Sequence, residues 1–112
     1  MSALAEKLRR ARRSRIEIDG RKFVITRPTD ADAASLGGMT MVEIICRFVV
    51  GWDGMTELDL GLPGGTDAPV EFDADVFGEW IVDQPKSWPE LSRAIVGTYK
   101  AHCEKRAAAE KN

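Results

Sequence analysis

Apolar and polar residues alternate along RIEIDGRKFVITRP, residues Arg15–Pro28, around a central Asp19-Gly20. Alternation with a period of two predicts paired β-strands, and Asp-Gly is a preferred two-residue hairpin turn. This turn places Glu17 opposite Lys22 on one face of the ribbon. The other face carries four apolar side chains: Ile16, Ile18, Phe23 and Ile25. A two-stranded ribbon is not stable alone, so this face must pack on helices or on a sheet edge of another subunit.

Helical spacing of apolar residues marks most of the remaining chain. Residues 1–13 place Leu4, Leu8 and Ala11 on one face, with arginines around them. A segment this short is expected to be helical when docked and frayed when free. The solvated-helix interpretation and a nucleic-acid or membrane-surface arm are both compatible with its pattern.

Four further helix starts follow from capping residues. Thr29, which is followed by Asp30 and Asp32, predicts the start of a short helix that ends before Gly37-Gly38. Thr40 to Glu43 has the capping-box pattern, and the apolar spacing after it continues to Trp52. Asp73 caps a helix through about residue 83, and Ser87 to Glu90 is another capping box that opens the last helix. Six residues of that last helix are expected to face the core: Leu91, Ala94, Ile95, Thr98, Tyr99 and His102.

The stretch Val49–Phe72 joins two apolar helices through a glycine-rich, acidic connection. Connections of this length are uncommon in compact domains unless they serve binding or a switch between order and disorder. The predicted fold is therefore α+β and mostly α: an N-terminal β-hairpin, then about four helices, with a long Gly-rich loop between the second and third. We expect a basic arm over residues 1–15, a single domain over 16–108 and a polar tail over 109–112.

Composition supports one soluble domain, and charge adds a strong segregation. The 112 residues are 44% hydrophobic and 30% charged, with a net charge of −2. Residues 1–27 carry nine Lys or Arg against three acids, whereas residues 28–90 carry two against thirteen. Residues 91–112 are basic again. The basic and acidic parts can neutralise one another within the fold or between subunits, and the pattern argues against a polyanionic partner for the whole domain.

Candidate chemistry is sparse, so we expect no enzyme, no cofactor and no metal site. His102 is the single histidine, and Cys46 and Cys103 lie far apart without metal-ligand spacing. The acidic segment from Asp53 fails the calcium-loop pattern, and GLPGG lacks the Lys-Ser/Thr of a phosphate loop. No apolar run is long enough to span a bilayer, and no secretory signal begins the chain, so we expect a cytoplasmic protein.

The order of features resembles the small tail assembly chaperones of long-tailed bacteriophages and prophages, over roughly Ile16 to the C-terminus. A hairpin ends in RPTDAD, an apolar segment ends in VVGWDGM, and a Gly-rich acidic loop leads to APVEF. The helix FGEWIVDQP and a polar tail, EKRAAAEKN, follow. The closest pieces are Gly51-Trp52-Asp53-Gly54, Pro69-Val70-x-Phe72 and Trp80 to Pro85.

That resemblance implies a non-enzymatic role in tail assembly. Members of the family bind the long, helical tape measure protein in the infected bacterial cytoplasm and keep it soluble until tail subunits polymerise around it. A frameshifted longer product recruits the major tail protein in many such phages, and the chaperone is absent from the finished virion. The charge pattern also suggests a homo-oligomer, in which the basic N-terminal segment of one copy contacts the acidic middle segment of another.

Two other function classes remain open. One is a head–tail connector or minor tail protein that stays in the virion. The other is a small nucleic-acid-associated phage regulator that uses the basic residues 7–15, although the aromatic residues lie in the acidic part of the chain.

Aromatic residues and methionine are the side chains from which we expect partner binding, because both are favoured at binding surfaces. Six of them surround the loop and the helix after it: Trp52, Met55, Phe72, Phe77, Trp80 and Trp88. The alternative is that all six form the core. Of the set, Trp52, Met55 and Trp88 are expected to be partly exposed.

Overall fold

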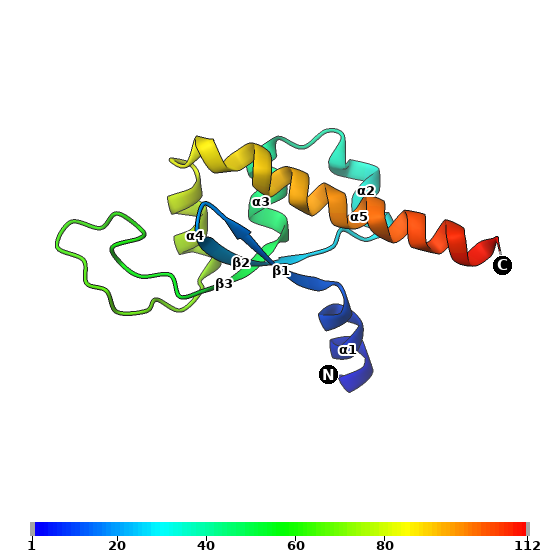
Figure 1. Cartoon of the computed structure of the whole chain (residues 1–112), viewed down its shortest axis with the longest axis horizontal. Helices are drawn as coiled ribbons and strands as arrows, with labels where there is room; N and C mark the ends of the chain where they lie inside the picture. The colour runs from blue at the N-terminus through cyan, green and yellow to red at the C-terminus, as the bar shows by residue number, and fades with distance from the viewer. Residues whose placement is uncertain (1, 112) are drawn as a thin grey trace.

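The computed structural model describes residues 2–111 and confirms an α+β fold in which about half of the residues are helical. Its elements run in this order: α1 Ala3–Ala11, β1 Arg13–Ile18, β2 Arg21–Thr26, α2 Asp30–Leu36, α3 Met41–Phe48, β3 Val49–Asp53, α4 Ala74–Ile81, a 3₁₀ turn Pro85–Ser87, and α5 Trp88–Glu110. The strands form one antiparallel sheet in the order β1-β2-β3. Figure 1 shows the long α5 crossing the molecule beside the sheet and the shorter helices.

Strands β1 and β2 are joined at Asp19-Gly20, and Glu17 lies opposite Lys22. Both turn residues have positive φ, 51° for Asp19 and 76° for Gly20, the left-handed backbone that a two-residue hairpin of this kind requires. One face of the pair is buried at Ile18, Phe23 and Ile25. That face is the one that the period-two pattern marks as apolar.

The predicted helix through Trp52 is wrong, because the chain leaves the helical conformation after Phe48. Val49–Asp53 instead forms β3, which pairs with β2 and places Trp52 opposite Phe23. Val49 is 4% exposed and Val50 36% exposed, an alternation that fits a strand and not a helix. The edge of β2 has backbone groups free to form hydrogen bonds, and this segment can pair with them only as a strand. The β-branched valines Val49 and Val50 also favour the strand conformation.

The N-caps predicted from the sequence form at three of the four helix starts. Thr29 and Asp32 form a capping box at α2, Thr40 and Glu43 form one at α3, and Asp73 caps α4. The capping box expected at Ser87 does not form. Ser87 is 6% exposed, and its hydroxyl lies 3.1 Å from Asp19 Oδ2, which ties the start of α5 to the hairpin turn.

The core lies between the apolar face of the sheet and helices α3, α4 and α5. Its members are Ile18, Phe23, Ile25, Ile44, Ile45, Phe48, Val49, Met55, Phe77, Trp80, Ile81, Leu91 and Ile95. Only Leu91 and Ile95 of α5 are fully buried, so the helix is anchored by its first half. Figure 1 shows its second half extending past the body toward the C-terminus.

Two secondary-structure elements cross the boundaries expected from the sequence, which concern domains and not elements. Strand β1 begins at Arg13, so the basic arm over residues 1–15 overlaps the sheet. Helix α5 continues through Glu110, beyond the expected domain end at residue 108. Helix α1 buries none of its residues, and Figure 1 shows it projecting from the body.

Candidate functional site

The six side chains expected to bind a partner divide into two groups. Met55, Phe77 and Trp80 are core residues, with 3%, 1% and 8% of their surface exposed. The expectation that Met55 is partly exposed is therefore wrong, because its side chain packs into the core cluster directly after β3. Trp52, Phe72 and Trp88 are half-buried, which agrees with the expectation for the two tryptophans.

Both half-buried tryptophans direct their indole N–H groups at their own chain. Trp52 Nε1 donates to the carbonyl oxygen of Val70 at 2.7 Å, and Trp88 Nε1 donates to that of Ile81 at 2.8 Å. Buried indole groups normally need such a partner. These two residues therefore fasten the loop and the α4–α5 connection, and neither offers a free donor to a ligand.

An apolar groove of about 460 Å³ lies between the long loop and α4. We call it the α4 groove, and it is lined by Leu60, Leu62, Asp75, Val76, Glu79 and Trp80. Val76 is 39% exposed and Leu62 49% exposed, so part of the apolar lining faces solvent. Asp75 and Glu79 lie one helical turn apart on α4 and give the groove an acidic rim. An exposed apolar hollow with a polar rim is the usual form of a docking site for another protein.

Hydrogen bonds across the long loop, residues 54–73, hold its wall of the groove in place. Val70 N donates to Met55 O at 2.8 Å, and Leu58 N donates to Thr66 O at 3.2 Å. Glu57 Oε1 accepts from both the backbone N–H (3.1 Å) and the hydroxyl (2.9 Å) of Thr66. These bonds lower the pKa of Glu57, the backbone bond being the larger cause. The loop is thus a shaped element, in Figure 1 the projection next to α4.

Two loop glycines explain why this segment is glycine-rich. Gly61 has φ of 76°, a conformation that side chains rarely adopt. A Cβ at Gly65 would lie 3.0 Å from Glu57 Cβ and 3.0 Å from the carbonyl oxygen of Leu62. The glycines therefore allow the tight return that brings Leu60 and Leu62 toward α4.

The chain segments that line the groove are acidic, and the nearest cation that the structure records beside them is Arg21, whose guanidinium lies over the Trp80 ring at 5.4 Å from its centroid. Residues 53–79 contain eight Asp or Glu and no Lys or Arg. No ion pair within residues 2–111 engages the carboxylates of Asp75 or Glu79. An apolar helix that carries Lys or Arg beside its apolar stripe would be both buried and neutralised here.

Sequence reasoning missed most of the groove, naming only Trp80 among its six lining residues. It favoured aromatic side chains, whereas the exposed apolar surface comes from Leu62 and Val76. A usable signal was present in the loop itself, where leucines recur at alternate positions: Leu58, Leu60 and Leu62. Leu60 is partly buried against the core, whereas Leu58 and Leu62 are exposed, so the alternating leucines indicate apolar surface outside the core.

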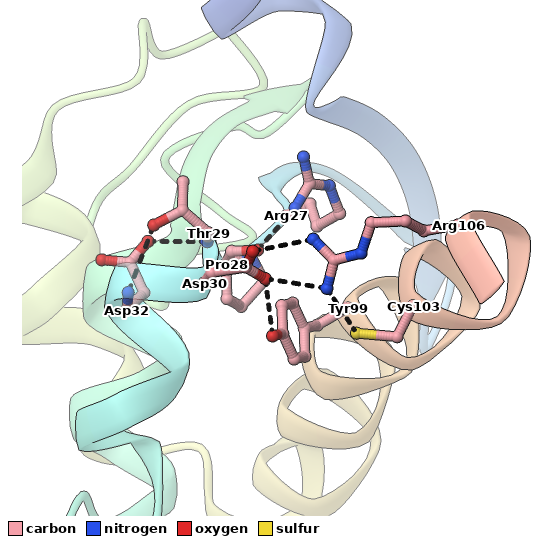
Figure 2. Close-up of polar contacts among 8 residues, drawn as sticks. All are labelled: Arg27, Pro28, Thr29, Asp30, Asp32, Tyr99, Cys103 and Arg106. Carbon is pink, nitrogen blue, oxygen red and sulfur yellow. Dashed lines mark hydrogen bonds and ion pairs between the residues drawn. The ribbon is translucent and has the colours of Figure 1, made fainter. Parts of the chain in front are cut away.

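A cluster of ionisable side chains joins α2 to α5 (Figure 2). Asp30 accepts from the Tyr99 hydroxyl at 2.8 Å and from Arg106 at 2.7 Å. Arg106 and then Tyr99 lower the pKa of Asp30 to about 2, and the same bond raises the pKa of Tyr99 to about 12. Neither group is poised for proton transfer near neutral pH, so we interpret the cluster as a tether.

Replacing Asp30 with asparagine should loosen the second half of α5. We expect amides beyond Tyr99 to exchange about two- to fivefold faster at neutral pH, as suits an exposed ion pair. The folded pKa of Asp30 is depressed from 3.8. In the unaltered chain the tether is therefore fully present above about pH 4 and is lost as the pH falls through the folded pKa. Amide hydrogen exchange of the Asp30→Asn variant measures the effect. The control is Glu104→Gln, a substitution at an exposed position on α5. Equal exchange rates beyond Tyr99 in the two variants would contradict the tether.

A smaller hollow of about 280 Å³ lies beside α1 and gathers five arginines: Arg9, Arg12, Arg13, Arg27 and Arg47. Two of these charges are already engaged. Arg47 pairs with Asp32 at 2.8 Å and Arg9 pairs with Glu6 at 2.8 Å. The hollow is the structural feature most compatible with the nucleic-acid alternative, although these pairs reduce its positive charge.

Other kinds of site find no support in the described part of the chain. No group of three or more His, Cys, Asp or Glu side chains among residues 2–111 is placed to hold a metal ion. No helix in the same range is long and apolar enough to cross a membrane. Nothing among known protein families, curated proteins or solved structures matches this chain.

Proposed function

We propose that this chain is a non-enzymatic tail assembly chaperone of a long-tailed bacteriophage or prophage, and that its α4 groove holds helical segments of the tape measure protein. The observation that carries the proposal is the groove itself, an exposed apolar hollow with unpaired carboxylates along one rim. In this role the chain works in the bacterial cytoplasm, passes the tape measure protein to the major tail protein, and leaves before the virion is complete.

The chemistry of such a client fits the groove. Long amphipathic helices aggregate through their apolar stripes when these are uncovered, and a groove on a small domain can cover one stripe at i, i+4 positions. On α4, Val76 and Trp80 are four residues apart, so the apolar floor has the same spacing of about 6 Å as a client helix. Many copies along one client would add avidity without needing high affinity at each groove.

The test is co-expression with the tape measure protein of a long-tailed phage. The unaltered chain should keep most of that protein in the soluble fraction. The double substitution Val76→Lys with Glu79→Lys should lower its soluble yield at least about tenfold, because it places charge on the apolar floor and reverses the rim.

A matched control is available on α5. Val96 is 38% exposed, close to the 39% of Val76, and Glu104 is exposed as Glu79 is. Val96→Lys with Glu104→Lys therefore makes the same chemical change away from the groove and should leave the yield unaltered. Equal precipitation with and without the unaltered chain would refute the proposal, and salt-sensitive binding to random duplex DNA in that case would favour the nucleic-acid alternative.

A further inference from the structure

Helix α1 presents an apolar row that its own chain leaves exposed. Leu4 and Leu8 lie one turn apart and are 68% and 57% exposed, and the helix buries none of its nine residues. An isolated helix of this length is marginal in water, so a surface that covers the row would stabilise it. The row is flanked by positive charge, since residues 2–13 carry five Lys or Arg and one Glu.

The α4 groove complements α1, because its lining is also apolar and its rim carries the opposite charge. Its lining is apolar at Leu60, Leu62 and Val76, and its rim carries Asp75 and Glu79. Side chains four residues apart on a helix are about 6 Å apart along its axis. The Leu4–Leu8 row of α1 therefore matches the Val76–Trp80 row of α4 in spacing. The basic flank of α1 likewise matches the Asp75–Glu79 row.

The two surfaces do not meet within one molecule. Figure 1 shows α1 projecting from the body on the side away from α4 and the long loop. Strand β1 begins at Arg13, two residues after α1 ends, so the linker is too short to carry α1 across the molecule. A contact between them needs a second copy of the chain.

We propose that α1 of one copy docks into the α4 groove of a second copy, with Leu4 and Leu8 on the apolar floor and the basic flank against Asp75 and Glu79. The contact is heterologous, because each copy contributes a different surface, and repetition therefore builds a ring or an open chain. It goes beyond the proposed function, since it requires no other protein. It also supplies a competitor that a client helix must displace from the groove.

Sedimentation of the full chain tests the contact. At low ionic strength the sedimentation coefficient should rise with protein concentration. Raising the salt to about 1 M shortens the Debye length to about 3 Å and should lower the association constant at least about tenfold. The head variant Leu4→Gln with Leu8→Gln and the groove variant Val76→Lys with Glu79→Lys should each sediment as monomers.

Mixing the two variants gives the decisive result. The groove variant keeps an intact α1 and the head variant keeps an intact groove, so the mixture should form a 1:1 dimer that does not extend. The control Val96→Lys with Glu104→Lys should self-associate as the unaltered chain does. The proposal is overturned if the unaltered chain stays monomeric at about 1 mM and low salt, if either variant still self-associates, or if the mixture of the two remains monomeric.

Discussion

Replacing Phe77 with alanine should lower the free energy of unfolding by about 3–5 kcal/mol. Phe77 is 1% exposed and lies at the centre of an aromatic cluster built from four different segments. Its ring centroid is 6.1 Å from that of Phe23, 6.2 Å from Trp52, 5.8 Å from Phe72 and 6.1 Å from Trp80. Removing the ring leaves a cavity among side chains already fixed by sheet, loop and helix, so little of it can collapse.

Urea denaturation followed by tryptophan fluorescence measures this loss, because all three tryptophans lie in or beside the core. The neighbouring residue provides the control. Val76 is 39% exposed on the same helix, and Val76→Ala should change stability by no more than about 0.5 kcal/mol. A loss below about 1 kcal/mol for Phe77→Ala would mean that the cluster does not support the fold, and Phe77 would again be a candidate for partner contact.

Features decided within a few residues could be predicted from the sequence. The Asp19-Gly20 turn sets the pairing of its neighbours, because a two-residue loop leaves no choice of register. Thr29 and Thr40 cap their helices through residues three positions away, so sequence alone contains both partners. The α+β class follows from the same local patterns.

Features decided by distant contacts could not be predicted. Val49–Asp53 has apolar spacing that suits a helix, and only the open edge of β2 makes it a strand. Ser87 has the residues of a capping box after it, yet its hydroxyl is held by Asp19, 68 positions away. The α4 groove likewise needs the loop to return against α4 before Leu62 and Val76 share a surface. Aromatic character does not separate core residues from partner-binding residues, and three of the six candidates, Met55, Phe77 and Trp80, lie in the core.

Trp52 is the residue whose substitution should separate the stability of the domain from the order of the loop. Trp52→Ala should cost about 3 kcal/mol, because the ring packs against Phe72 at 5.0 Å between centroids and against Phe77. Trp52→Phe keeps an aromatic ring but removes the 2.7 Å hydrogen bond to Val70 O, at a cost of about 1 kcal/mol. The loop's end then loses its side-chain attachment to β3, and the amides of Val70 and Leu58 should exchange about fivefold faster.

Trp88→Phe is the matched comparison for this prediction. Trp88 also donates its indole N–H to a backbone carbonyl, that of Ile81 at 2.8 Å, and it too is half-buried. Its removal should cost a similar amount of stability while leaving exchange in the loop unaltered, because Ile81 lies at the end of α4 and not in the loop. If both variants accelerate loop exchange equally, the loop opens only with global unfolding, and the Trp52–Val70 bond has no separate effect. If only Trp52→Phe does so and client solubility falls with it, the ordered loop is needed for the groove to bind.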